Sequence, residues 1–279
     1  MTQSTPIELL SAHGFSSLEL KHPSPRLAAV LVLLHHHPHP ESDGGHLRVL
    51  LTTRSKSLRT HPGQTALPGG RKEDEDGDLI YTALREANEE VGLPIPEEYY
   101  RRYSHSVQNS KTVGTTNSIR ILCTLEPVLS LHKLIVTPVV AFLEDPAILD
   151  TLQPSEGEVS RIFTYPLEAI LDPTVLIQLK EPLVDKGTED WPYDEDLHHY
   201  DDHIVTSLDN TPYRYHRFRS SASPVTGLTS DILIKAATIA YHPRRTSYVP
   251  SAPDQVVGYD FVQLILNRHR EPEGEVAGV

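Results

Sequence analysis

Residues 69–93 constrain the fold more than any other stretch, because they predict a glycine turn followed by an amphipathic helix. Apolar residues recur at intervals of three and four, as on one buried stripe of a helix: Ile80, Leu84, Ala87 and Val91. Gly92 fits the position just past the helix end. We therefore expect the rest of the chain to be arranged around this helix.

Three glutamates on another face of the helix point to a divalent cation. Glu86, Glu89 and Glu90 lie within one turn, where carboxylates repel each other at neutral pH unless a cation lies among them. Glu89 and Glu90 also occupy the last turn, where the helix dipole favours Lys or Arg. Oxygen ligands on a rigid element suit Mg²⁺ or Mn²⁺, so the sequence predicts such a site. The alternative is a solvated acidic helix.

The same segment resembles the Nudix box, in which a Gly, five residues, a Glu and seven residues precede Arg-Glu-apolar-x-Glu-Glu-x-Gly-apolar. The helical half matches at every position: Arg85, Glu86, Ala87, Glu89, Glu90, Gly92 and Leu93. The front half differs, because Asp76 takes the place of the first Glu and the gap to Arg85 is one residue too long. The register of Asp76 and Asp78 is therefore open. This longer loop resembles the eukaryotic coenzyme A diphosphatase branch of the family.

A second resemblance lies directly before the box, in LLTTRSKSLRTHPGQTALPGG, residues 50–70. Coenzyme A diphosphatases carry a segment of the type LLTxRSxxLRxHxGxxxFPGG there, and only Leu67 departs from it. Independently of the family, potential cations cluster in this stretch: Arg54, Lys56, Arg59 and His61. Such a cluster suits a ligand with several phosphates, since Arg offers paired donors to phosphate oxygens. The alternative is a solvated basic loop that pairs with the acidic EDEDGD segment.

Composition excludes several other classes of protein. A net charge of -13 argues against a surface that coats nucleic acid. The single cysteine, Cys123, excludes an internal disulfide, and its apolar surroundings predict a core residue. No apolar run reaches the length of a membrane span. We expect the cytosol, because neither a secretory leader nor an SKL-type C-terminus is seen, while the family resemblance leaves the peroxisome open.

The remaining pattern predicts an α/β protein, and the resemblance implies a Nudix-type α/β/α sandwich with a mixed sheet and a catalytic loop-helix-loop. Strands are expected at residues 26–34, 47–55, 118–129 and 134–144, and helices at 227–241 and from Asp260 onward. Pro138 indicates an edge or a bulge. Thr229 or Ser230 is the expected N-cap of the 227–241 helix.

We expect a single domain over residues 24–270, a peripheral segment at 1–23 and a loose tail at 271–279. Residues 178–211 read as an acidic insertion and not as a separate domain. Two histidine-rich stretches, at 35–39 and 198–203, are predicted to be loops and not metal sites.

Residues 154–171 read as a loop, a short strand to Phe163 and a helix from about Pro166. In related enzymes an Asp/Glu-Val pair precedes a strand here, and Glu158-Val159 matches it. The resemblance thus implies that Glu158 is a further active-site carboxylate, while the alternative is a surface acid.

The implied activity is hydrolysis of the diphosphate bond of coenzyme A or its derivatives to 3′,5′-ADP and a 4′-phosphopantetheine product. Arg85 would orient Glu89, and either Glu86 or Glu158 would accept the proton. Arg54, Arg59 and His61 would bind the phosphates, and Gly69 and Gly70 would let the backbone approach the substrate. The alternatives are a hydrolase acting on (8-oxo-)dGTP and an inactive ligand sensor. A homodimer also stays open.

Overall fold

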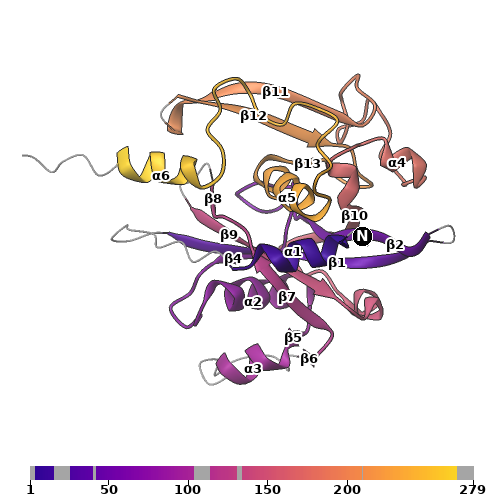
Figure 1. Cartoon of the computed structure of the whole chain (residues 1–279), viewed down its shortest axis with the longest axis vertical. Helices are drawn as coiled ribbons and strands as arrows, with labels where there is room; N and C mark the ends of the chain where they lie inside the picture. Colours follow the sequence, from indigo (N-terminus) through magenta and orange to yellow (C-terminus); the bar gives the residue numbers. More distant parts are fainter. Residues whose placement is uncertain are drawn as a thin grey trace, which may run out of the picture.

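The computed structural model describes residues 4–15, 26–39, 42–103, 114–130, 134–208 and 210–268. A mixed sheet forms the middle of the molecule (Figure 1), and its main path runs β10-β2-β1-β9-β7. These strands are β1 (Leu27–His39), β2 (Ser42–Arg54), β7 (Ile119–Thr124), β9 (Ile135–Leu143) and β10 (Val159–Pro166). Along this path β1 and β9 are parallel and the other neighbours are antiparallel. The predicted α/β class with a mixed sheet is confirmed.

Three short strands extend this sheet, and two of them flank Pro68. They are β3 (Thr65–Ala66), β4 (Gly69–Arg71) and β8 (Val128–Leu129). β3 pairs with β2 and β4 pairs with β1, so the chain returns to the sheet on both sides of the Pro68 turn before it enters the long helix. The glycine turn is thereby attached to the central strands.

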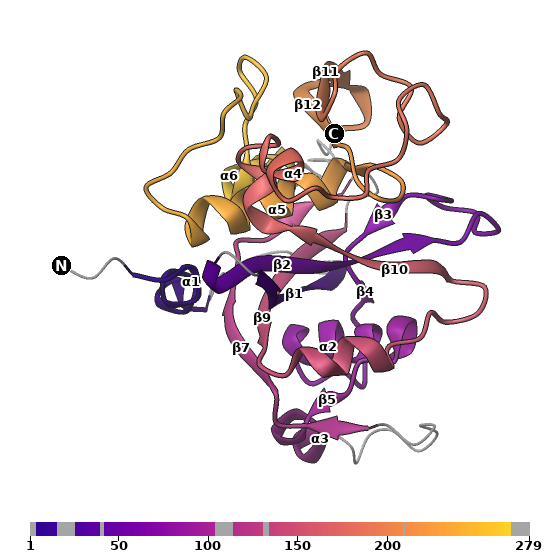
Figure 2. The ribbon, with the colours of Figure 1, turned by 90° about the vertical axis from the view of Figure 1, so that its right-hand side faces the viewer.

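The two faces of the sheet are covered by different helices (Figure 2). α2 (Leu79–Val91) lies on one face, and α5 (Gly227–Ala240) and α1 (Pro6–His13) lie on the other. Successive side chains of β1 point to opposite faces of the sheet, so this one strand contributes to both cores. Leu31 and Leu33 join the core under α2, and Val32 joins the core under α5. A strand that is buried on both faces reads as a continuous apolar run.

The N-terminal segment is not peripheral, in contrast to the expectation. Thr5 caps α1 by accepting a hydrogen bond from the Glu8 N–H, and the Glu8 carboxylate bonds back to the Thr5 N–H. Leu10 is fully buried in the core that also contains residues of α5. The helix α1 therefore belongs to the folded unit.

The histidine-rich stretch continues the two central strands instead of forming a loop. His37 pairs with His46 and His39 pairs with Ser42, so the strands reach almost to the turn. The register shifts between His37 and His39, where Pro38 lies, and such a bulge accommodates a residue that has no N–H. The prolines predicted a loop here, but pairing between β1 and β2 keeps the segment in the strand conformation.

Pro138 was expected at an edge or a bulge, but β9 lies between β1 and β7 in the sheet. The Pro138 carbonyl accepts a hydrogen bond from the Leu125 N–H. The carbonyl, and the place where other residues have an N–H, therefore face the side of β7 and β8. Leu125 lies in the break between β7 and β8. The missing N–H thus falls where the ladder is interrupted, which permits a proline in a central strand.

The chain after β10 differs from the predicted helix. β10 continues to Pro166, and only a 3₁₀ turn, η3 (Leu167–Ile170), and a one-turn helix, α4 (Val175–Gln178), follow. The other small elements are β5 (Ile95–Pro96), α3 (Glu97–Tyr103), β6 (Thr115–Thr116), η2 (Pro146–Thr151) and η4 (Thr206–Leu208).

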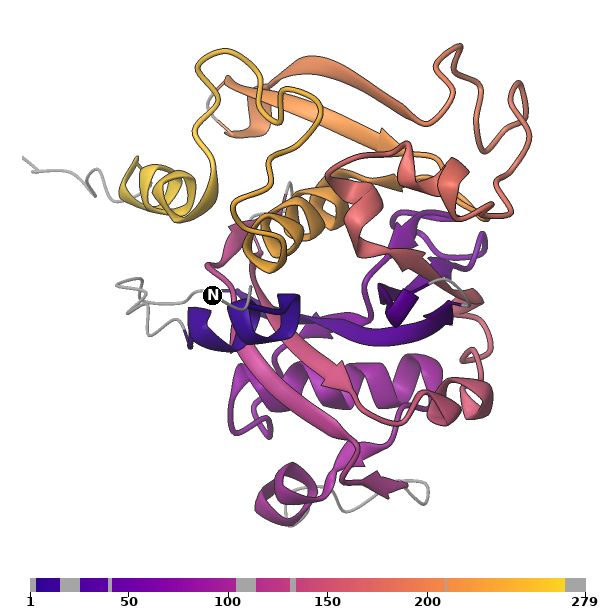
Figure 3. The same ribbon diagram turned by 45° about the vertical axis from the view of Figure 1, so that its right-hand side comes forward.

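A second sheet lies over α5 (Figure 3) and includes the end of the predicted insertion. It contains β11 (His198–Val205), β12 (Thr211–Phe218) and β13 (Val225–Thr226). The histidines at 198–203 are therefore in a strand and not in a loop. The Tyr213 hydroxyl donates to Asp231 of α5 at 2.8 Å, which ties the sheet to the helix.

The C-terminal part of the described chain agrees with the predicted helices in place but not in every detail. α5 begins at Gly227 with Thr226 as its N-cap residue, so neither Thr229 nor Ser230 caps it. The last helix, α6 (Gly258–Arg268), buries Val262 and Ile265. The predicted tail lies outside the described residues. None of the described helices has the length and apolarity that crossing a membrane requires.

Candidate active site

The acidic helix α2 is defined at both ends by local hydrogen bonds. The Asp78 carboxylate accepts from the Tyr81 N–H at 2.7 Å and caps the first turn. At the other end Gly92 has a φ of 71°, and its N–H donates to the Asn88 carbonyl at 2.9 Å. The structure confirms the predicted helix end at Gly92. The three glutamates lie in the last two turns of the helix.

A buried ion pair holds the helix to the loop before it. Arg85 donates to both carboxylate oxygens of Asp76, from Nε at 2.9 Å and from Nη2 at 3.0 Å. Asp76 is 2% exposed and also accepts from the Thr82 hydroxyl and the Glu73 N–H. Burial alone would raise the pKa of Asp76, but these hydrogen bonds, led by those from Arg85, hold it below its usual value. The open register is thus resolved, with Asp76 as the partner of Arg85.

The same guanidinium also contacts two of the three glutamates. Its Nη2 donates to Glu86 at 3.0 Å, and its Nη1 donates to Glu89 at 3.1 Å. Burial would lower the pKa of Arg85, but the hydrogen bonds to Asp76 and the charge of Glu86 raise it above its usual value. Arg85 is therefore a permanent cation that fixes the rotamers of both glutamates, as expected for Glu89.

Gly69 and Gly70 place the backbone directly against the helix and the sheet. A Cβ on Gly70 would lie 2.4 Å from the Glu86 carboxylate, and one on Gly69 would lie 2.4 Å from the Ala29 carbonyl oxygen. Gly69 also has a φ of 155°, which side-chain-bearing residues rarely adopt. In this structure both glycines make room for chain atoms: Gly70 for the carboxylate, and Gly69 for β1.

Glu90 carries the strongest electrostatic signal of the three glutamates. Burial, together with the negative charge of Glu86, raises its pKa to about 8, while the Gly69 N–H and Arg54 oppose the shift. The pKa of Glu86 is also raised, chiefly by burial. Two carboxylates that resist ionisation beside each other are a fit for a divalent cation, because the cation would remove the cost of both charges.

Glu89 differs from the other two glutamates in its surroundings. Its side chain is 55% exposed and paired with Arg85, whereas that of Glu86 is 18% exposed. In the ranges that the structure describes, no group of three or more His, Cys, Asp or Glu side chains is arranged to hold a metal ion. The structure thus brings Glu86 and Glu90 together and leaves Glu89 turned toward the guanidinium.

The loop before β10 carries Glu158 to the same end of α2. The Ser155 N–H donates to the Glu90 carbonyl at 2.8 Å, and the Ser55 N–H donates to the Glu158 carbonyl at 2.8 Å. Val159 pairs with Arg54 across β10 and β2. Glu158 is exposed and its charge contributes to the raised pKa of Glu90, so its carboxylate lies near that of Glu90.

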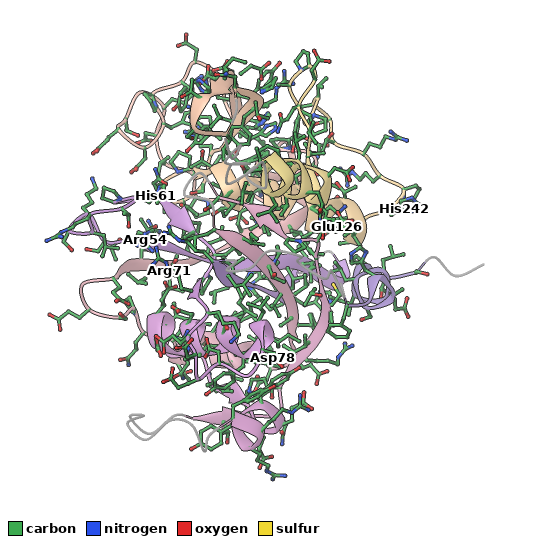
Figure 4. The ribbon with its side chains drawn as sticks, turned by 90° about the vertical axis from the view of Figure 1, so that its left-hand side faces the viewer. Arg54, His61, Arg71, Asp78, Glu126 and His242 are labelled. Carbon is green, nitrogen blue, oxygen red and sulfur yellow. The ribbon has the colours of Figure 1, made fainter. Side chains whose placement is uncertain are left out.

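The predicted phosphate ligands lie at the end of β2 and in the loop that follows it. Arg54 donates from Nε to the Thr60 carbonyl at 3.4 Å, and its charge acts on Glu90. Arg59 and His61 are exposed in this loop, where His61 Nδ1 lies 3.0 Å from Gln64 Oε1. In Figure 4 Arg54 and His61 lie on the same side of the molecule, away from Asp78 at the start of α2. Arg54 is thus beside the carboxylates, and the other two line the adjoining loop.

Comparison with known proteins identifies a family for this chain. Residues 40–185 match the family model described as the NUDIX domain. Nudix hydrolase 15, mitochondrial, of Arabidopsis thaliana is 33% identical over 229 residues, which are 82% of this chain and 63% of that protein.

Two animal relatives match over a shorter stretch. Peroxisomal coenzyme A diphosphatase ndx-8 of Caenorhabditis elegans is 36% identical over 149 residues, or 53% of this chain and 51% of the relative. Peroxisomal coenzyme A diphosphatase NUDT7 of Mus musculus is 35% identical over 135 residues, or 48% and 47%. The chain spans less than two thirds of the length of each of these three relatives. The matched range covers more than half of the chain and contains α2 with its glutamates, and the chain belongs to the Nudix hydrolase family.

Proposed function

We propose that the protein is a metal-dependent diphosphatase that hydrolyses coenzyme A or its derivatives to 3′,5′-ADP and a 4′-phosphopantetheine product. The observation that carries the proposal is the pair Glu86 and Glu90, whose pKa values are both raised at the end of α2 with Arg54 alongside. The substrate rests on the segment at residues 50–70 and on the names of two relatives.

Each residue of the site has a role that follows from its contacts. Glu86 and Glu90 would hold the cation, and Glu89 would join them only after turning away from Arg85. Bound Mg²⁺ or Mn²⁺ would neutralise the diphosphate and lower the pKa of the attacking water. Asp76 and Arg85 fix the Glu86 carboxylate, so that its position does not change as charge develops.

The phosphates and the proton are handled by residues from other elements. Arg54 would contact the diphosphate, and Arg59 and His61 would contact phosphates that extend toward the loop. Glu86 and Glu158 remain the two candidates for the proton acceptor, because each carboxylate lies beside Glu90. Glu158→Gln separates them, since loss of the acidic limb of the pH profile of kcat would assign the proton transfer to Glu158.

A direct test is incubation with Mg²⁺ and either coenzyme A or (8-oxo-)dGTP, with separation of the products. Formation of 3′,5′-ADP supports the proposal. Release of pyrophosphate or nucleoside monophosphate from the second substrate alone would replace it with the nucleotide-hydrolase alternative. Absence of product from both, while Mg²⁺ binds, would favour the inactive sensor.

The compartment and the oligomeric state belong to the proposal as well. We propose a cytosolic protein that acts on a small molecule, although the relatives above are named mitochondrial or peroxisomal. Imaging of a fluorescent fusion tests the compartment, and light scattering of the purified protein tests whether it is a homodimer.

A further inference from the structure

A cavity of about 450 Å³ opens at the far end of β2 from the acidic site, and nothing in the proposed reaction uses it. We call it the hairpin pocket. Its lining includes the cross-strand pair His37 and His46 of the β1–β2 hairpin. It also includes Arg48 of β2, Phe163 of β10, and Lys180 and Glu181, which follow α4. Figure 1 shows α4 above this hairpin. The volume lies within the range of small-molecule sites, about 300–1,000 Å³.

Arg48 forms a fixed cationic wall of the hairpin pocket. It is 8% exposed and donates to the Thr164 hydroxyl at 2.8 Å, to the Thr164 carbonyl at 2.9 Å and to both carboxylate oxygens of Glu181. These bonds use four of the five N–H donors of a guanidinium. One Nη1–H donor is therefore left for a ligand, on a side chain that cannot turn away.

Lys180 also lines the hairpin pocket and has a backbone conformation that is costly for lysine. Its φ is 54°, at the position after α4 where a left-handed residue ends the helix and glycine is usual. The Glu181 N–H donates to the Leu176 carbonyl at 2.9 Å and holds this turn. Strained residues of this kind gather at ligand-binding positions. The turn thus presents an exposed lysine to the pocket, while the next residue, Glu181, is paired with Arg48.

The remaining lining suggests a ligand with an apolar part. Phe163, Leu179 and Pro182 supply apolar surface, and the imidazoles of His37 and His46 add groups that can donate to an anion. Arg48 and Lys180 outnumber the single acid, Glu181, in a chain whose net charge is -13. The lining therefore selects for negative charge where the chain as a whole repels it.

From this geometry we infer that the hairpin pocket is a second binding site, for a small organic anion. Its phosphate or carboxylate group contacts Lys180 and the spare Nη1–H of Arg48, and its apolar group contacts Phe163. Arg54 is six positions along β2 from Arg48, which at a rise of about 3.3 Å per residue is about 20 Å. The site is thus distinct from the acidic pair, and the proposal does not depend on the substrate of the enzyme.

The test is an amide chemical-shift map of the full chain in EDTA, titrated with phenyl phosphate, benzoate or benzyl alcohol. Phenyl phosphate, benzoate or both should shift the amides of residues 46–48 and 179–181, and the neutral alcohol should not. Stronger binding of either anion identifies the preferred acid group. Shifts confined to the loop after Arg54 and to α2, or equal shifts with the alcohol, would overturn the inference.

Lys180→Gly is the decisive variant, because glycine removes the charge and also relieves the left-handed conformation. We expect a Tm no lower than that of the wild type. We also expect at least tenfold weaker binding of the anion that shifts the pocket amides in the titration. The matched control is Lys235→Gln, which removes one positive charge from exposed Lys235 of α5 and should leave binding within twofold. Wild-type affinity in Lys180→Gly would refute the site.

Discussion

Glu90→Gln should stabilise the metal-free protein at alkaline pH, although it removes a proposed metal ligand. Burial, together with the charge of Glu86, raises the pKa of Glu90 from 4.5 to about 8. At 1.36 kcal/mol per pKa unit this difference corresponds to about 5 kcal/mol, which is an upper limit for one carboxylate. The uncharged amide avoids that cost, so the variant gains most where wild-type Glu90 is ionised.

The sign of the pH dependence follows from the direction of the shift. Because the folded-state pKa is raised, the wild type loses stability, relative to the variant, as pH rises from about 4.5 to about 8. In EDTA the two proteins should have similar free energies of unfolding at pH 5. At pH 9 the variant should be more stable by up to about 5 kcal/mol. Urea unfolding at a series of pH values measures the difference.

Divalent cations should narrow this difference in stability. Mg²⁺ at 100 times its Kd should stabilise the wild type by about 2.7 kcal/mol and should have little effect on the variant. Glu89→Gln is the matched control, because its side chain is 55% exposed and paired with Arg85. A gap between Glu90→Gln and the wild type that does not widen from pH 5 to pH 9 would refute the reasoning.

Three further substitutions test the supports of the site. Asp76→Ala leaves Arg85 buried without its main partner and should cost about 3–5 kcal/mol in urea unfolding, with a fall in kcat; wild-type stability would exclude Asp76 as the anchor. Gly70→Ala places a Cβ 2.4 Å from Glu86 and should lower kcat at least tenfold with a folded circular dichroism spectrum; unchanged kcat would show that the carboxylate can move freely. Arg59→Ala should raise KM several-fold at constant kcat, and an unchanged KM would remove Arg59 from phosphate binding.

The sequence was most informative where local rules and tertiary structure agree. The apolar stripe of α2, its end at Gly92 and the buried position of Cys123 are all present. Periodicity, helix capping and apolar runs each describe contacts within a few residues, so one sequence contains enough information for them.

Long-range pairing explains most of what the sequence did not show. The strand conformation of His35 comes from β2 and β9 on either side of β1, and that of His37 comes from β2 alone; no neighbour in sequence indicates either. The role of Asp76 required the position of Arg85, nine residues away across a loop of irregular length. Its only signal in the sequence was the departure from the family pattern at that place.

The place of β1 has a practical consequence for any attempt to isolate a minimal catalytic unit. A shortened protein limited to the matched range, residues 40–185, would lack β1 together with α1 and α5. Deleting β1 would separate β2 from β9 and split the sheet in two, and it would remove Ala29, Leu31 and Leu33 from the apolar core beneath the acidic helix. Limited proteolysis should therefore find no stable fragment that begins after His39.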